Sequence, residues 1–175
     1  MKEEGGSCAY HWRRFLTVPA SGTHPIMHIT LANAADAGRL FEVWEAAVTA
    51  THDFLDSAAI AALAPVVREL LHSVTPIYCI RDAAGQAFAF MGVQGRMLEM
   101  LFVHPSHRGQ GAGRLLTSRA VTRLGVREVD VNEDNLQALG FYEQLGFRRY
   151  ARSARDGFGN PYPILHLRLE QDVAR

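Results

Sequence analysis

The stretch from Ile77 to Val103 constrains the fold most, because it holds three runs of strand-forming residues joined by short turns. The runs are Ile77 to Arg81, Ala87 to Val93 and Met97 to Val103, with turn residues at Asp82-Ala83-Ala84-Gly85 and at Gly95. Strands joined by so few residues run antiparallel. We therefore expect an antiparallel meander in the middle of the chain.

After Val103 the pattern changes to alternating helices and strands. The expected helices are Gly111 to Leu124 and Leu136 to Leu145, and the expected strands are Glu128 to Val131, Phe147 to Arg152 and Ile164 to Leu169. A meander that continues into such an alternation predicts an α/β fold. Its mixed sheet of six or seven strands would be covered by helices on both faces.

Before the meander, the pattern predicts a strand from His28 to Leu31 and a helix capped by Asn33, with Asp36 in its first turn. The segment from Thr51 to Leu55 would interrupt the helices. A pair of helices split by Pro65 would follow, because proline breaks a helix interior. The apolar positions recur at helical spacing: Leu40, Phe41, Trp44, Ala47 and Val48 in the first helix, then Ile60, Leu63, Val67, Leu70 and Leu71.

Length and composition predict one folded domain. The chain has 175 residues, 48% of them hydrophobic, and residues 1–26 show no hydrophobic period, so we expect an irregular extension before a domain spanning 27–175. Basic and acidic residues balance at 18 each, which argues against nucleic acid or an anionic membrane as partner. Two cysteines and no long apolar run predict a cytoplasmic protein.

A glycine-rich loop lies between a predicted strand and a predicted helix, in the run Arg108-Gly109-Gln110-Gly111-Ala112-Gly113-Arg114. Alternating glycines let a ligand approach the backbone, and the N–H groups of a helix N-terminus bind pyrophosphate. The Walker loop and the dinucleotide fingerprint both fail, because Arg114 stands where each needs a glycine. The pattern Arg108-x-x-Gly111-x-Gly113 remains.

This pattern, after Leu101-Phe102-Val103-His104-Pro105, resembles the acyl-CoA-binding motif of the GNAT N-acetyltransferases. A second segment, Asn135 to Phe147, is similar to that family's Asn-x-x-Ala-x-x-Phe-Tyr-x-x-x-Gly-Phe segment. The resemblance covers about Met27 to Leu169. Three further segments look like the small bacterial YjaB-like branch, namely Ala50 to Leu55, Val131 to Glu133 and Gly159 to Pro163.

The resemblance implies the GNAT fold, with acetyl-CoA bound where the strands Met97 to Val103 and Glu128 to Val131 part. Gln110, Gly111, Ala112 and Gly113 would hold the pyrophosphate, and Gly109 would belong to the same cofactor-binding loop. Leu101, Phe102 and Val103 would align the pantetheine arm through their backbone. Arg108 and Arg114 would each either donate to phosphate or face water. Asn135 would cap its helix and contact the CoA arm.

Two residues are candidate catalysts. By pattern, Tyr142 is a core tyrosine on a helix with Leu136, Leu139 and Leu145; by resemblance, its hydroxyl donates a proton to the CoA thiolate. Glu99 interrupts an apolar strand that we expect to be buried on both faces, where a carboxylate is costly unless paired or functional. It is either the general base for the acceptor amine or an ion-pair partner of Arg96.

The acceptor site is the least defined part. His52 and Asp53 lie where the family builds its acceptor pocket, so they would bind the amine or order a water; alternatively, Asp53 caps the next helix. His104 and His107 lack partners at metal-ligand spacing, so we expect no metal.

We expect direct acetyl transfer from acetyl-CoA to a primary amine, and the YjaB-like resemblance suggests a protein lysine. The alternatives are acetylation of a small amine, such as a polyamine, aminoglycoside or amino acid, and a non-catalytic acyl-CoA sensor. Whether the protein is a monomer or a homodimer stays open.

Overall fold

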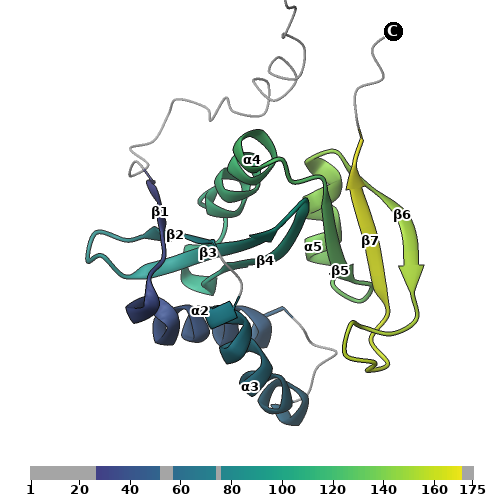
Figure 1. Cartoon of the computed structure of the whole chain (residues 1–175), viewed down its shortest axis with the longest axis horizontal. Coiled ribbons are helices and arrows are strands. Elements are labelled where there is room, and N and C mark those ends of the chain that lie inside the picture. Colours follow the sequence, from purple (N-terminus) through teal and green to yellow (C-terminus); the bar gives the residue numbers. More distant parts are fainter. Residues whose placement is uncertain (1–26, 52–56, 74–75, 171–175) are drawn as a thin grey trace, which may run out of the picture. The chain divides into compact units, whose positions relative to one another are not determined.

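The protein folds around a seven-stranded mixed sheet with the strand order β1-β2-β3-β4-β5-β7-β6 (Figure 1). The structure is a computed structural model that describes residues 27–51, 57–73 and 76–170. The strands are β1 (Ile29–Leu31), β2 (Ile77–Arg81), β3 (Ala87–Gln94), β4 (Met97–Val103), β5 (Glu128–Asn132), β6 (Phe147–Ser153) and β7 (Ile164–Leu169). The mixed α/β fold and the antiparallel meander are confirmed.

The helices cover both faces of this sheet, as expected. They are α2 (Ala37–Thr49), α3 (Ser57–Ser73), α4 (Ala112–Leu124) and α5 (Leu136–Gln144), with short 3-10 turns η1 (Ala34–Asp36) and η2 (Pro105–His107). Figure 1 shows α2 and α3 on one side of β3 and β4, and α4 on the other. No helix among the described residues is both long and apolar enough to cross a membrane.

The largest core cluster lies between α2, α3 and the sheet. It includes Leu40, Trp44, Val67, Phe90 and Met100, all buried. The predicted stripe of the first helix is buried throughout, whereas in α3 only Val67 and Leu71 are fully buried. The amphipathic pattern therefore identified the face of each helix that meets the sheet.

The prediction of two helices split at Pro65 is wrong, because α3 is one helix of 17 residues with Pro65 inside it. Proline in a helix interior removes one hydrogen bond and costs about 3 kcal/mol. Here the pyrrolidine ring is exposed, Val67 and Leu71 beyond it are buried in the core, and Ile60 and Leu63 before it are partly buried against the core. Apolar burial on both sides of the proline offsets its local cost.

The sheet opens between its two central parallel strands. β4 and β5 pair only through Met97 with Glu128 and Leu98 with Val129, although both strands continue further. The register between β3 and β4 shifts at the same point, from Gly92 opposite Met100 to Val93 opposite Leu98. Glu99 is thus the extra residue of a β-bulge, which bends β4 at the position where β5 leaves it.

A partly buried ion pair ties the start of α2 to β2. Asp36 is 9% exposed and accepts hydrogen bonds from both terminal nitrogens of Arg81 at 2.8 Å. It also accepts from the backbone N–H of Asn33, which completes the predicted cap as a capping box. The hydrogen bonds from Arg81 lower the pKa of Asp36 below its ordinary value.

We predict that Asp36→Asn destabilises the protein at pH 7 by about 1 to 3 kcal/mol, because the Arg81 guanidinium loses a charged partner. A carboxyl whose pKa is lowered by folding stabilises the protein above its unfolded pKa of about 3.9, and this contribution disappears as the pH falls through the lowered pKa. Urea unfolding at pH 7 and near pH 3 measures this. Glu133→Gln, in an exposed pair with Arg152, is the control and should change stability little. A loss that is equal at both pH values would contradict the prediction.

Candidate active site

A cavity of about 480 Å³ occupies the gap between β4 and β5 and extends between the N-termini of α4 and α5. Most of the predicted site residues line this cavity. The predicted residues that line it are Glu99, Leu101, Phe102, Val103, Arg108, Gly109, Gly111, Ala112, Gly113, Arg114, Asn135 and Tyr142. Gln110 does not line it, because its side chain is exposed and donates back to the Ser106 carbonyl at 3.5 Å.

The glycine loop has the backbone shape that its sequence indicated. Gly109 and Gly111 adopt φ angles of 75° and 91°, in the left-handed region that favours glycine. Gly111 is the N-cap of α4, a helix of 13 residues, so the first N–H groups of that helix have no partner within it. A Cβ added at Gly109 or Gly111 would meet no atom within 4 Å, which leaves the loop open to a ligand. The loop therefore fits an anionic group such as a pyrophosphate.

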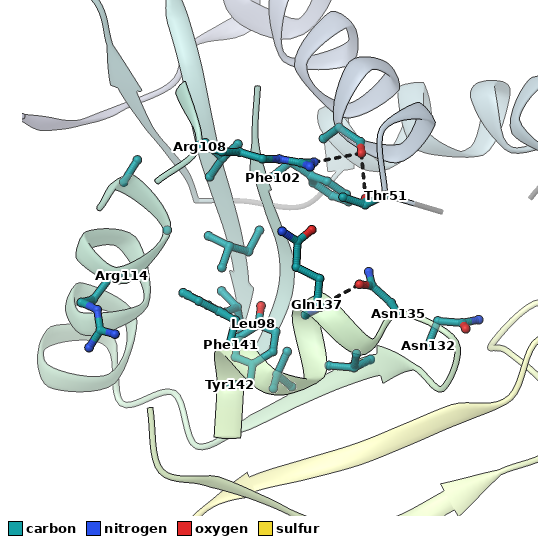
Figure 2. Close-up of a pocket in the computed structure, with 18 of the residues that line it drawn as sticks. Thr51, Leu98, Phe102, Arg108, Arg114, Asn132, Asn135, Gln137, Phe141 and Tyr142 are labelled. Atoms are coloured by element: carbon teal, nitrogen blue, oxygen red, sulfur yellow. Dashed lines mark hydrogen bonds between the residues drawn. The ribbon is translucent and has the colours of Figure 1, made fainter. Parts of the chain in front are cut away.

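The two arginines of the motif lie in different surroundings. The guanidinium of Arg108 crosses to α2 and donates to the Ala47 carbonyl at 3.2 Å, and burial lowers its pKa (Figure 2). Arg114 lies on α4, apart from the other labelled side chains (Figure 2). Arg108 therefore does not simply face water. Its hydrogen bond links the glycine loop to the C-terminal turn of α2.

The C-terminal half of β4, beyond its pairing with β5, presents unpaired backbone groups to the cavity. Just after β4, the N–H of His104 donates to the carbonyl of Phe88 on β3 at 2.8 Å. Because backbone groups alternate in direction along a strand, those of Phe102 also face β3, while those of Leu101 and Val103 face the side that β5 has left. These N–H and C=O groups are available to an extended ligand lying along the strand.

Glu99 lines the cavity, but the expectation of a strand buried on both faces is wrong at this position. Its side chain is exposed toward the cavity, since the bulge and the departure of β5 leave the strand uncovered there. Partial burial raises the pKa of Glu99, and repulsion by Asp130 raises it further. No ion pair joins Glu99 to Arg96. The carboxyl is thus a stronger base than an ordinary glutamate.

Tyr142 is 6% exposed, and its hydroxyl points from α5 into the cavity (Figure 2). Its ring packs edge-on against Phe141 and Phe147. Burial raises the pKa of the phenol well above its usual value, so the oxygen keeps its proton. The predicted apolar stripe of α5 holds for Leu145 but not for Leu136, which is 72% exposed in the first turn of the helix.

Asn135 caps α5 as predicted, with its side-chain oxygen accepting from the Ala138 N–H at 3.0 Å. Several lining residues were not predicted, including Asp130, Asn132 and Gln137. Asn132 and Gln137 lie beside Asn135 in Figure 2. The sequence could have indicated Asp130 only if the strands of Asp130 and Glu99 were known to be neighbours. That knowledge requires the strand order of the sheet.

His52 and Asp53 lie outside the described residues. Within the described part of the chain, no group of three or more His, Cys, Asp or Glu side chains could hold a metal ion.

We predict that Gly111→Ala and Gly113→Ala have different effects on stability. Alanine at Gly111 must adopt a left-handed conformation, which costs about 1 to 2 kcal/mol. Gly113 is helical, and its added Cβ would lie 3.5 Å from the Phe141 ring, an ordinary contact. Thermal unfolding should therefore show a lower melting temperature for Gly111→Ala and no loss for Gly113→Ala. Equal melting temperatures would mean that the loop relaxes without strain.

Comparison with known proteins assigns the chain to a family. Residues 75–149 match the model of the acetyltransferase (GNAT) domain. The peptidyl-lysine N-acetyltransferase YjaB of Salmonella typhimurium is 35% identical over 142 residues, which are 81% of this chain and 97% of that protein. The solution structure of apo-form YjaB from Escherichia coli matches with a TM-score of 0.76 and 34% identity, over 82% of this chain and 97% of that one.

A more distant structure shares the fold. The PaiA N-acetyltransferase of Thermoplasma acidophilum, solved in complex with coenzyme A, matches with a TM-score of 0.61 at 17% identity, over 80% of this chain and 97% of that one. The resemblance seen in the two sequence motifs is thus confirmed over most of the chain. The protein belongs to the GNAT family of N-acetyltransferases, and it is an acyltransferase.

Proposed function

We propose that this protein transfers an acetyl group from acetyl-CoA directly to a primary amine, and that the acceptor is a lysine side chain of a protein. One observation carries the proposal: the glycine loop, the open edge of β4, Glu99 and Tyr142 all line a single cavity. The names of the two YjaB relatives support lysine as the acceptor.

Acetyl-CoA fits the groups around the cavity. The N–H groups at the start of α4 and the loop at Gly109 and Gly111 would hold its pyrophosphate. The backbone of Leu101 and Val103 would bind the pantetheine arm and the thioester carbonyl by hydrogen bonds. When bound, acetyl-CoA supplies the acetyl group as a thioester that an amine can attack.

In this proposal Glu99 removes a proton from the acceptor ammonium. A neutral amine is the nucleophile, so a base with a raised pKa next to the acceptor is useful. The side chain projects into the cavity and the described residues provide no basic partner for it in an ion pair. Its carboxylate therefore stays free to accept the proton.

Tyr142 acts on the departing sulfur. Its hydroxyl keeps its proton, because burial raises its pKa. A thiol has an ordinary pKa of about 8.5, well below that of such a phenol, so complete proton transfer to the thiolate is uphill. We infer that Tyr142 stabilises the thiolate chiefly by donating a hydrogen bond.

The direct test is thiol release from acetyl-CoA in the presence of a lysine peptide, with the same peptide blocked by acetylation as the control. Thiol release should match the acetyl-lysine formed, as measured by mass spectrometry. Turnover with a polyamine, an aminoglycoside or a free amino acid but not with the peptide would establish a small-molecule acceptor. Coenzyme A binding without any turnover would indicate a sensor.

We predict that Tyr142→Phe lowers kcat by roughly 10²-fold, the loss expected when one hydrogen-bond donor to a developing negative charge is removed. The substitution removes one oxygen and keeps the ring contacts with Phe141 and Phe147, so the fold should be unchanged. The measurements are kcat at saturating amine and the dissociation constant of coenzyme A, which should barely change. A wild-type kcat with chemistry rate-limiting would remove Tyr142 from the mechanism.

We predict that Glu99→Gln removes the acid limb of the rate-pH profile and leaves coenzyme A affinity unchanged. The base works only when deprotonated, so the wild-type rate should rise with pH through the raised pKa of Glu99, above the usual glutamate value of about 4.3. Glutamine keeps the shape but cannot accept the proton. If the variant retains both the wild-type rate and the limb, the base is another residue, and His52 would be tested next.

A further inference from the structure

Asp130 is a second carboxylate at the point where the sheet opens. The last paired positions of β4 and β5 are Leu98 and Val129, so Glu99 and Asp130 are the next residues on the two strands. Both line the cavity, and Asp130 is close enough to raise the pKa of Glu99 by repulsion. The acetyl-transfer chemistry described above assigns no role to Asp130.

A chain of hydrogen bonds holds the Asp130 carboxylate across three strands. His166 on β7 lies directly opposite Asp130, and its Nδ1 is 2.7 Å from the carboxylate. The Nε2 of the same ring is 2.8 Å from the hydroxyl of Ser153 on β6. Because a carboxylate only accepts, Nδ1 carries a proton and donates a hydrogen bond to Asp130, while Nε2 forms the hydrogen bond with the Ser153 hydroxyl.

Asp130 differs from the glutamates near it on the chain, because those glutamates pair with arginines. Glu128, two residues earlier on β5, pairs with Arg168, and Glu133 pairs with Arg152. Within the described residues, Asp130 forms no ion pair with an arginine, and its carboxylate is hydrogen-bonded to the His166 imidazole. Two adjacent carboxylates at one cavity are stabilised by a cation placed between them.

A separate observation indicates that the cavity accepts a ligand with a polar group. The Tyr142 hydroxyl is directed into it from a side chain only 6% exposed, and no described residue forms a hydrogen bond with that hydroxyl. The hydroxyl oxygen is open to the cavity and is not sealed in the core, so a ligand in the cavity can reach it. A substrate in the cavity would supply a hydrogen-bond partner.

We propose that Asp130 binds the acceptor amine as its ammonium ion, and that His166, held by Ser153, positions the Asp130 carboxylate for this contact. The acceptor is therefore a cation that lies between Asp130 and Glu99 before Glu99 takes its proton. This inference rests on the proposed function and names residues that select its substrate.

The first test is Asp130→Asn, assayed with acetyl-CoA and a lysine peptide. The KM for the peptide should rise about 10-fold or more, because a hydrogen bond to a charged group is lost, while kcat falls less. The dissociation constant of coenzyme A should be unchanged. Glu128→Gln is the matched control: it removes a carboxylate from the same strand, but Glu128 does not line the cavity, so KM should stay at the wild-type value.

The second test asks whether His166 positions the Asp130 carboxylate or only stabilises the fold. His166→Asn keeps an N–H donor near the place of Nδ1, whereas His166→Leu removes it. We expect His166→Leu to raise the peptide KM about as much as Asp130→Asn, and His166→Asn to restore most of the loss at equal thermal stability. Equal KM values for the two variants would show that the ring does not position Asp130.

Binding without turnover distinguishes this inference from the proposed function. Calorimetry with the lysine peptide, and separately with a polyamine, is done on the protein saturated with coenzyme A. Weaker binding of either amine by Asp130→Asn supports the inference even when no acetyl transfer occurs. Wild-type affinity and KM in Asp130→Asn overturn it while leaving the acetyltransferase function intact. Failure of the wild-type protein to bind either amine overturns both.

Discussion

The separation of β4 from β5 is the constraint on which the rest of the structure depends. Two paired positions join the strands, and the β-bulge at Glu99 then turns β4 away. A fully paired sheet would satisfy its own backbone groups and leave no room between α4 and α5. The gap instead leaves N–H and C=O groups of Leu101 and Val103 without strand partners, and it admits an extended ligand into the middle of the sheet.

The same opening brings opposite electrostatic features to one cavity. On one side, the N-terminus of α4 and the glycine loop offer partial positive charge to an anion. On the other side, Glu99 and Asp130 offer negative charge at the edge of the gap. An acyl donor with a pyrophosphate and a cationic amine would therefore bind at different ends of the cavity. The Tyr142 hydroxyl projects into the same cavity, and in the proposed mechanism it donates to the sulfur between them.

Much of the fold could be predicted because local patterns and tertiary packing agree. The strand runs, the Asn33 cap and the Gly111 turn are each specified by residues close in sequence. Pro65 shows where local patterns fail to predict the fold. Proline by itself predicts a helix break, but burial of Val67 and Leu71 beyond it keeps α3 continuous. Glu99 shows another limit, since the apolar run around it indicates a covered strand and cannot reveal a bulge.

The sequence by itself determined the anion-binding loop and the family, because glycine at alternate positions before a helix is a local requirement on φ angles and backbone access. It also provided Tyr142 as a candidate through that resemblance, and Glu99 as a candidate because a carboxylate interrupts an apolar strand. Only the tertiary structure decided which groups share the cavity. Asp130, His166 and Ser153 come from three strands that are neighbours only in the order β5-β7-β6, and Arg108 meets Ala47 across 61 positions of sequence. Contacts of this kind depend on strand order and packing, which no local pattern encodes.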